Sequence, residues 1–347
     1  MTRAVFAIPG DKDRRTGGFI YEARVLRELN DIGCATQHLQ LPDSFPDAND
    51  ADMAATFDAL NAVPDHLPII LDGLVFGAID VDRLAQVSAP VIAMVHHPLG
   101  LETGLPRDRA AYLLQNEASA LRHVDHVIVP SDETARILCR DLGADADRIT
   151  VAPPGFDRPV LDRRTLDPPL ILSVGLLAPR KGHDILLTAL GQINEIPWQA
   201  SIVGKSHDAA YAERVLTLRS DLGLGDRVDF AGEVDGDALA TLFNAAAVFV
   251  LATRYEGYGM VLSEAMQFGL PVVSCRVGAV PDTVGDAGVL VPPDDPGALA
   301  QALRSVLQDG GYAEDLAERS TRRAAALPRW SDTAHIFSKV IATVASD

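Results

Sequence analysis

The chain has 347 residues, of which 48% are hydrophobic and 22% charged, a composition that fits a globular protein with room for two domains. Its formal net charge of −18 and its aromatic content of only 5% argue against a nucleic-acid partner, because phosphates would be repelled and few rings could stack on bases. Cys34, Cys139 and Cys275 form neither a disulfide framework nor a zinc spacing, and the N-terminus does not read as a signal peptide. We therefore expect a cytoplasmic protein.

Short apolar strands alternate with helical patterns through the first half of the chain. The predicted strands are residues 4–8, 34–41, 67–71, 91–96, 126–129 and 148–152. One helix follows Thr16-Gly17-Gly18, and another begins after Ser131, a good N-cap residue with acidic residues behind it. Strands that alternate with helices predict a parallel sheet with both faces covered, so residues 1–155 are expected to form one Rossmann-like domain.

The composition changes after Ala152, and the alternation then begins again. Prolines and charges without periodicity predict an interdomain linker over residues 156–169. Strands are predicted at 170–174, 200–203, 227–230, 247–251, 271–275 and 288–291, with helices between them. Residues 170–328 are thus expected to form a second Rossmann-like domain, and two amphipathic segments, 313–327 and 331–344, finish the chain.

A glycine-rich turn in the second half predicts an anion site. Gly257 and Gly259 follow a strand and precede a helix at 260–268, whose first N–H groups lack intrahelical partners and suit a diphosphate. Glu256 precedes this turn, and Glu264 is the one charged residue of the helix. A buried carboxylate needs donors, which the two hydroxyls of a ribose would supply. The alternative is that Glu264 caps a loop and Glu256 favours the positive helix end.

Glu256 and Glu264 are separated by seven residues in EGYGMVLSEAMQFGLPVV, and this stretch resembles the E-x7-E signature of retaining glycosyltransferase family 4. The resemblance implies an α/β GT-B fold, in which two Rossmann-like parallel-sheet domains face a central cleft. It implies that residues 1–155 bind the acceptor, that residues 170–328 bind the nucleotide-sugar donor, and that a C-terminal helix at 329–347 packs back on the N-terminal domain. Glu256 would meet the donor sugar and Glu264 the ribose.

Gly175 to Gly182 resemble the phosphate-binding loop of this family, which ends in Lys-Gly. Arg180 and Lys181 match that end, whereas Leu176 stands where the family commonly has arginine. Such cations could stabilise a departing diphosphate. The alternative is an exposed Arg-Lys pair in a loop, but Lys181 is one of only four lysines and precedes a glycine at a strand–helix junction.

The remaining site residues follow from the resemblance. Gly17 and Gly18 would lie near the donor phosphates, and His96, at the end of a strand, would contact the donor sugar; alone, these residues would read as a turn and a structural histidine. Asp72 could meet the acceptor. The predicted catalytic residues are His96, Arg180, Lys181 and Glu256, and the predicted donor-binding residues are Gly17, Gly18, Gly175, Val203, Gly204, Val234, Tyr258, Gly259, Met260, Val261 and Glu264.

The resemblance predicts a retaining hexosyltransferase that uses a nucleotide-diphosphate sugar as substrate and needs no cofactor and no metal. The Asp80/Asp82 and Asp235/Asp237 pairs are expected by chance in a chain so rich in aspartate. A diacylglycerol-like membrane lipid is the first expectation for the acceptor, with peripheral contact at the inner membrane face. The alternatives are a saccharide or small soluble acceptor, a GT-B sugar-nucleotide epimerase, and a non-catalytic sugar-nucleotide binder.

Overall fold

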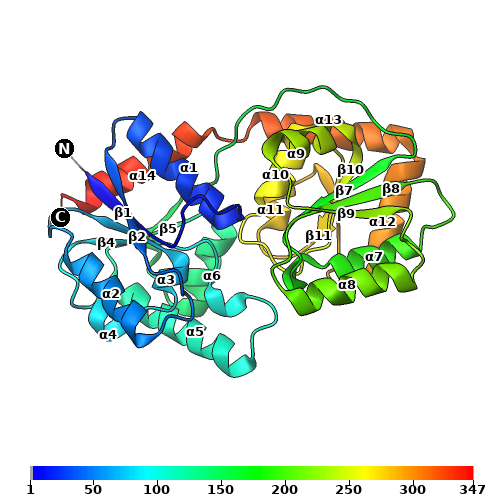
Figure 1. Ribbon diagram of the computed structural model, residues 1–347. Coiled ribbons are helices and arrows are strands. Elements are labelled where there is room, and N and C mark those ends of the chain that lie inside the picture. The colour runs from blue at the N-terminus through cyan, green and yellow to red at the C-terminus, as the bar shows by residue number, and fades with distance from the viewer. Residues whose placement is uncertain (1–2, 347) are drawn as a thin grey trace. The chain divides into compact units, whose positions relative to one another are not determined.

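The computed structural model describes residues 3–346 and divides into two units, each containing a six-stranded parallel sheet (Figure 1). The first unit extends to Phe156 and resumes at Pro328, and the second is Asp157–Leu327. The expected α/β class with two Rossmann-like parallel sheets is confirmed.

The sheet of the first unit has the order β2-β1-β3-β4-β5-β6. Its central strands are buried on both faces, as the apolar run Ile69-Ile70-Leu71 illustrates. The strand bounds are β1 Ala4–Pro9, β2 Thr36–Leu41, β3 Ile69–Asp72, β4 Val91–Met94, β5 His126–Val129 and β6 Ile149–Val151. β3 pairs in parallel with β1 and β4, so the loops after these three strands share one edge of the sheet.

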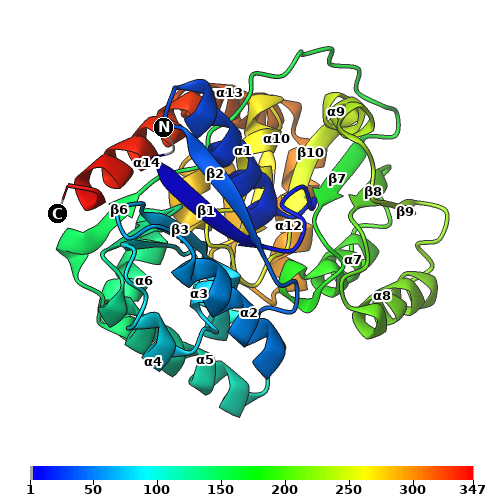
Figure 2. The same cartoon turned by 60° about the vertical axis from the view of Figure 1, so that its left-hand side comes forward.

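Helices cover both faces of this sheet, with α1 and α14 side by side on one of them (Figure 2). The helices are α1 Gly17–Asp31, α2 Asp50–Asn61, α3 Gly73–Phe76, α4 Val81–Leu84, α5 Arg107–Ala120, α6 Asp132–Leu142 and α14 Trp330–Val344, with short 3-10 turns at Leu99–Leu101, Leu121–His123 and Ala146–Arg148. Ser131 caps α6 as expected, because its side chain accepts the N–H of Thr134. Sequence periodicity does not predict α3 or α4, since each has only four residues.

The C-terminal helix α14 is built into the first unit through the buried ring of Tyr21. This ring meets Trp330 edge-on at 5.8 Å and Phe337 at 6.1 Å, and its hydroxyl donates to the carbonyl of Ala152 at 2.8 Å. A side chain at Gly155 would collide with the backbone of Trp330 at 2.2 Å. Close backbone packing and aromatic contacts thus hold α14 against α1.

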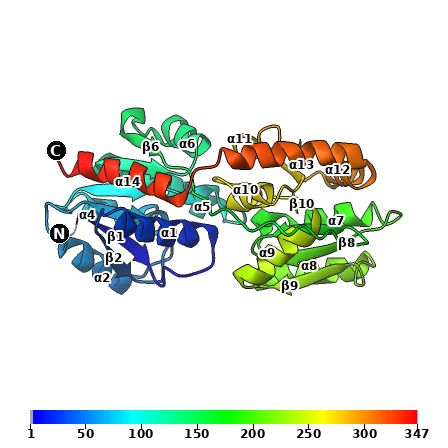
Figure 3. The same ribbon diagram turned by 90° about the horizontal axis from the view of Figure 1, so that it is seen from above.

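The sheet of the second unit has the order β12-β11-β10-β7-β8-β9. α7, α8 and α12 cover one face, while α9, α10 and α11 cover the other (Figures 1 and 3). The strands are β7 Leu170–Val174, β8 Gln199–Val203, β9 Val228–Gly232, β10 Ala246–Leu251, β11 Val272–Cys275 and β12 Gly288–Val291. The helices are α7 His183–Gly191, α8 Ala209–Asp221, α9 Gly236–Ala245, α10 Met260–Gln267, α11 Val280–Val284, α12 Pro296–Gln308 and α13 Gly310–Ala325, and a 3-10 turn covers Pro179–Lys181.

Of the linker expected at 156–169, residues 157–169 run as an extended segment along the second unit, while Phe156 belongs to the first. Arg163 donates to the carbonyls of Phe243 and Ala246, both at 2.8 Å, and Arg158 donates to the carbonyl of Ala324 at 2.8 Å. Within residues 3–346, every helix is too short or too polar to cross a membrane.

Candidate active site

The predicted catalytic cations and Glu256 come from two neighbouring strands of the second unit. β10 pairs in parallel with β7, so the loops that follow them leave the sheet at the same edge. The loop after β7 carries Arg180 and Lys181, and the loop after β10 carries Glu256. The carboxyl edge of a parallel sheet is the usual place for a ligand site in this class of fold.

Glycines let the backbones of these loops approach closely. At Gly182, which has a φ of 64°, an added Cβ would lie 2.0 Å from the carbonyl oxygen of Ala252. At Gly204 it would lie 2.0 Å from the carbonyl oxygen of Gly175. The loop after β7 is therefore packed between the ends of β8 and β10, with no space for larger residues at these two positions.

Arg254 fixes the position of the loop that bears the cations. Its guanidinium donates to both carboxylate oxygens of Asp184, at 3.1 and 2.9 Å, and to the carbonyl of Pro179. Its Nε donates to Asp294 at 2.7 Å, and its backbone N–H donates to the carbonyl of Arg180 at 2.7 Å. Together these hydrogen bonds hold both ends of the 179–184 segment against the loop after β10.

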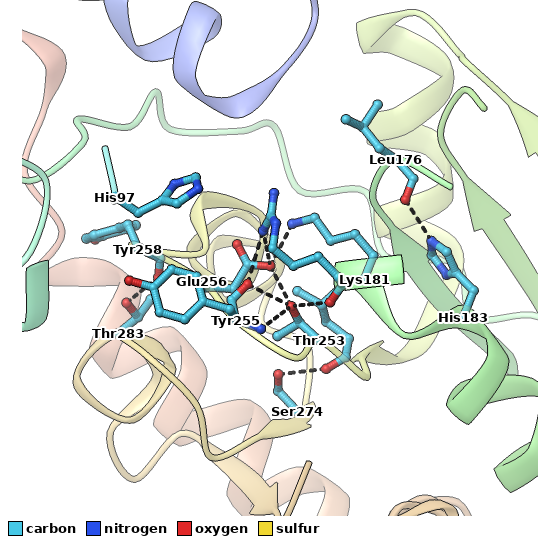
Figure 4. A network of polar contacts seen from close by, with 12 residues as sticks. His97, Leu176, Lys181, His183, Thr253, Tyr255, Glu256, Tyr258, Ser274 and Thr283 are labelled. Carbon is cyan, nitrogen blue, oxygen red and sulfur yellow. Dashed lines mark hydrogen bonds and ion pairs between the residues drawn. The ribbon is translucent and has the colours of Figure 1, made fainter. Parts of the chain in front are cut away.

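Glu256 is buried at the centre of a charged cluster. Its Oε1 lies 2.6 Å from Nζ of Lys181, 3.4 Å from the guanidinium of Arg180 and 2.9 Å from the hydroxyl of Thr253. Figure 4 shows Lys181 and Thr253 directed at this carboxylate. The side chains of Arg180 and Lys181 are only 18% and 12% exposed, so the alternative of a solvated surface pair does not describe them.

Two opposing effects determine the pKa of Glu256. Burial alone would raise it, but the positive charges of Lys181 and Arg180, together with hydrogen bonds from Lys181 and Thr253, hold the pKa below its ordinary value. Glu256 is thus a carboxylate at neutral pH, and the cluster of two cations and one anion has a net positive charge. Such a cluster can attract a phosphate.

The helix α10 begins beside this cluster. Gly259 is its N-cap, in a left-handed conformation with a φ of 84°, the predicted helix is present, and Gly269 after its C-terminal end is also left-handed. The amides of Met260 and Val261 lie in its first turn, where intrahelical acceptors are missing. Gly278, in the loop after β11, packs so closely that an added Cβ would lie 2.3 Å from the carbonyl oxygen of Glu256. The turn that carries Glu256 is therefore held from both sides.

Glu264 lies on α10, half-buried, and differs from Glu256 in having no charged partner. Among the described residues, no donor lies within hydrogen-bond distance of its carboxyl group. Burial raises its pKa to about 7. Glu264 therefore does not cap a neighbouring loop, which was the alternative interpretation. Its carboxyl group can accept hydrogen bonds from a bound ligand.

His183 is buried at the carboxyl edge of the second unit's sheet, where it begins α7. No sequence motif marks it as a site residue. Its Nε2 lies 3.1 Å from the carbonyl of Leu176, the position where an arginine was expected, and burial lowers its pKa to about 4. The ring is therefore neutral and donates to the loop. Thr253 was also missed; its position at the end of β10 is the signal that could have identified it.

The remaining predicted residues fall into two groups. Gly175, Val203, Gly204, Val234, Tyr258 and Gly259 lie in the second unit with the cluster, at or near the ends of its strands. Gly17, Gly18 and His96 lie in the first unit, where a Cβ at Gly18 would be 3.3 Å from Cδ2 of His96. Asp72, considered for the acceptor, caps α3 by accepting the N–H groups of Leu74 and Val75 at 2.8 and 3.3 Å.

Only one group of described residues has converging metal-type ligands. Glu22, Asp72 and His96 place one ligand atom each within 4.8 Å of one another in the first unit. Glu22 was not singled out from the sequence, because it occupies one position of an amphipathic helix and no motif marks it.

Comparisons with known proteins match both units. The model described as "Glycosyl transferases group 1" matches residues 162–323, and the model described as "Glycosyltransferase Family 4" matches residues 74–158. The D-inositol 3-phosphate glycosyltransferase of Acidothermus cellulolyticus is 33% identical over 219 residues, which cover 57% of this chain and 49% of that protein. The matched part thus spans about half the length of the curated relatives.

Solved structures with the same fold cover the whole chain. Sucrose-phosphate synthase from Thermosynechococcus elongatus has a TM-score of 0.83 at 23% identity, covering 99% of both chains. Anabaena HepE in complex with UDP and glucose has a TM-score of 0.78 at 18% identity, covering 99% of this chain and 100% of that one.

The two parallel-sheet units and the likeness to these solved structures show a GT-B fold. Both family models describe glycosyltransferases, and the chain is therefore GT4-like, as the resemblance predicted.

Proposed function

We propose that this protein is a retaining, metal-independent hexosyltransferase that uses a nucleotide-diphosphate hexose. The observation that supports this most strongly is the buried cluster of Arg180, Lys181 and Glu256 beside the start of α10. A diphosphate bound there would meet two cations and the N-terminal amides of a helix, which together stabilise the negative charge that develops on a leaving group.

Each residue of the second unit has a proposed role. Lys181 and Arg180 turn from Glu256 to the diphosphate when the donor binds, and the freed Glu256 carboxylate accepts hydrogen bonds from sugar hydroxyls. Thr253 keeps one oxygen of Glu256 in place. Glu264 accepts both ribose hydroxyls, which would supply the donors that its half-buried carboxylate lacks. The backbone at Val203, Gly204 and Val234 contacts the base.

The transfer step needs no dedicated general base. The bond between the anomeric carbon and the phosphate oxygen breaks, and the acceptor oxygen bonds to the same face of that carbon. Because the acceptor bonds on the face that the phosphate leaves, the anomeric configuration is retained, and because the acceptor's proton passes to the departing phosphate oxygen, the charges balance. His96 of the first unit is the further proposed sugar contact.

The first experiment is a thermal-shift screen with UDP-, GDP- and ADP-sugars, followed by turnover measurements with the donor that binds. Glu256→Ala is expected to abolish transfer while leaving the fold intact, whereas Glu213→Ala, at an exposed position of α8, is the matched carboxylate control. Transfer by Glu256→Ala at the original rate would overturn the assignment. Activity in EDTA and the anomeric configuration of the product test metal independence and retention.

Two kinds of acceptor are proposed. A diacylglycerol-like lipid follows from the family resemblance, and it would bring the protein to the inner face of a membrane. The names of the curated relatives favour instead a soluble phosphorylated polyol, and a saccharide is the other soluble alternative. Turnover with lipid vesicles, with inositol phosphates and with oligosaccharides separates these acceptors. A labelled donor with no acceptor tests the epimerase alternative, since an epimer of the donor sugar would then accumulate.

A further inference from the structure

Three titratable side chains meet at the carboxyl edge of the first unit's sheet, outside the cluster described above. Oε1 of Glu22, on α1, lies 3.2 Å from Nε2 of His96, and an oxygen of Asp72, at the end of β3, lies within 4.8 Å of both. Glu22 and Asp72 are 0% and 3% exposed, whereas the His96 side chain is 22% exposed. The histidine is therefore the member of this group that an outside molecule can reach.

The buried carboxyl groups cannot both be charged. Neither has an arginine or lysine partner among the described residues, and two adjacent buried carboxylates would repel each other strongly. Asp72 accepts two backbone N–H groups, which favour its charged form. Glu22 has one neighbouring N–H donor, His96, and a side-chain hydrogen bond connects its carboxyl group to that of Asp72. Because burial and the neighbouring Glu22 also raise the pKa of Asp72, the pair shares a single proton.

The orientation of the His96 ring is fixed by α1. Its Cδ2 packs on Gly18, its Nε2 faces Glu22, and the edge of Tyr21 meets it at 5.3 Å. Cδ2 and Nε2 lie on one side of the imidazole, so Nδ1 is on the side turned away from α1. The titratable groups that face His96 are Glu22 and Tyr21 from α1 and Asp72 from β3, while α6 contributes the uncharged Thr134.

We propose that Glu22 is a positioning residue whose carboxyl group shares one proton with Asp72 and accepts the Nε2–H of His96. This relay holds His96 as the neutral Nε2–H tautomer and leaves Nδ1 as a hydrogen-bond acceptor. Burial raises the pKa of Glu22 to about 8, also raises the pKa of Asp72 and lowers that of His96, so the carboxyl pair keeps a proton and the imidazole stays neutral at neutral pH.

With Nδ1 as an acceptor, His96 favours a ligand group that donates a hydrogen bond, such as a hydroxyl. An imidazole nitrogen with a lone pair accepts a hydrogen bond from a substrate hydroxyl and does not donate to a phosphate. This step rests on the proposed function, in which His96 contacts a sugar. The relay itself concerns the free protein and can be tested without any substrate.

The test compares two variants of Glu22 that differ in whether the side chain can form hydrogen bonds with His96 and Asp72. Glu22→Gln is the isostere of a protonated glutamate, because its carbonyl can accept from His96 while its amide donates to Asp72. Glu22→Leu has a similar size and offers neither. In ¹⁵N-edited NMR of the full chain, with the His96 signal assigned by His96→Gln, we expect the Nε2–H tautomer between pH 6 and 8 in the wild type and in Glu22→Gln. Glu22→Leu should give a mixture of tautomers.

Three outcomes of the NMR measurement would overturn the relay. The first is a Glu22→Gln spectrum that resembles that of Glu22→Leu, and the second is a wild-type His96 that is already an imidazolium at pH 7. The third is specific broadening of the His96 signal by micromolar Mn²⁺, which would make the three residues a metal site. Trp330 fluorescence monitors folding of this unit, and the wild-type and Glu22→Gln results decide the question even if Glu22→Leu unfolds.

Turnover supplies the second measurement. With a donor that is turned over, kcat/KM should be unchanged in Glu22→Gln and fall about tenfold in Glu22→Leu, the effect of losing one well-placed hydrogen bond. Equal turnover in Glu22→Leu and wild type would refute the role of Nδ1 in substrate binding. If no nucleotide sugar is turned over, the proposed function fails, while the tautomer measurement still decides the relay.

Discussion

Replacing Lys181 with methionine removes the closest cation from Glu256 and little else. Methionine keeps most of the stem that packs on Gly175, where an added Cβ would lie 3.3 Å from Cδ of Lys181. The Glu256 carboxylate, only 5% exposed, would be left with Arg180 at 3.4 Å and the Thr253 hydroxyl. Breaking a buried ion pair costs about 3 kcal/mol or more when nothing compensates. With Arg180 remaining, we expect a loss of about 2 kcal/mol in the free energy of unfolding.

A second substitution shows whether the loss comes from the stranded charge. Glu256→Gln in the Lys181→Met background removes that charge, so the double variant should recover at least about 1 kcal/mol relative to the additive expectation. The loss should also depend on pH. The native pKa of Glu256 lies below its ordinary value of 4.5, so the stability from its pairing is present above that pH and disappears as the pH falls through the native pKa.

The assay must report on the second unit alone. The chain has two tryptophans, the buried Trp198 in the second unit and Trp330 in the first, so urea unfolding followed by fluorescence in a Trp330→Phe background reports on the second unit. Lys205→Met, at an exposed position after β8, is the matched control and should change stability by less than about 0.5 kcal/mol. Equal stability of Lys181→Met and Lys205→Met, or strict additivity in the cycle, would refute the buried ion pair.

Three further predictions concern the same unit. Gly182→Ala should destabilise it by about 2 kcal/mol, because the position has a positive φ and an added Cβ would overlap the carbonyl of Ala252; urea unfolding measures this. Arg254→Lys should weaken nucleotide binding about tenfold in calorimetry, because a lysine cannot hold Asp184, Asp294 and the 179–182 loop at once. Glu264→Gln should raise the melting temperature at pH 8 and lose this advantage near pH 4.5, since burial raises the native pKa to about 7 and stability therefore falls as the pH rises between these values.

Control variants and contradicting results can be named for these three predictions. Gly191→Ala, in the last turn of α7 where a Cβ finds ordinary contact distances, should be neutral or stabilising, and equal effects at both glycines would contradict the close approach at Gly182. Arg304→Lys alters an exposed ion pair with Glu195 and should leave nucleotide affinity unchanged. A Glu264→Gln advantage that is the same at both pH values would mean that the carboxyl group is not desolvated.

The local pattern of the chain determined its class, most of its elements and the turn that carries Glu256. Apolar runs such as 69–71 and 248–251 must be buried on both faces, and glycine at 259 and 269 marks where the backbone turns left-handed. These features depend on residues close in sequence, and a single chain displays them. The short helices α3 and α4 escaped prediction because four residues are too few for a period to appear.

Only the tertiary structure decided which charges meet. The sequence offered Lys181 and Glu256 as separate candidates, and their contact exists because β7 and β10 are neighbours in the sheet although 75 residues separate the two side chains. In the same way, Glu22 and His96 are 74 residues apart and share a site because α1 packs beside the end of β4. The protonation of a carboxyl group depends on burial and on such distant partners, so no local motif can specify it.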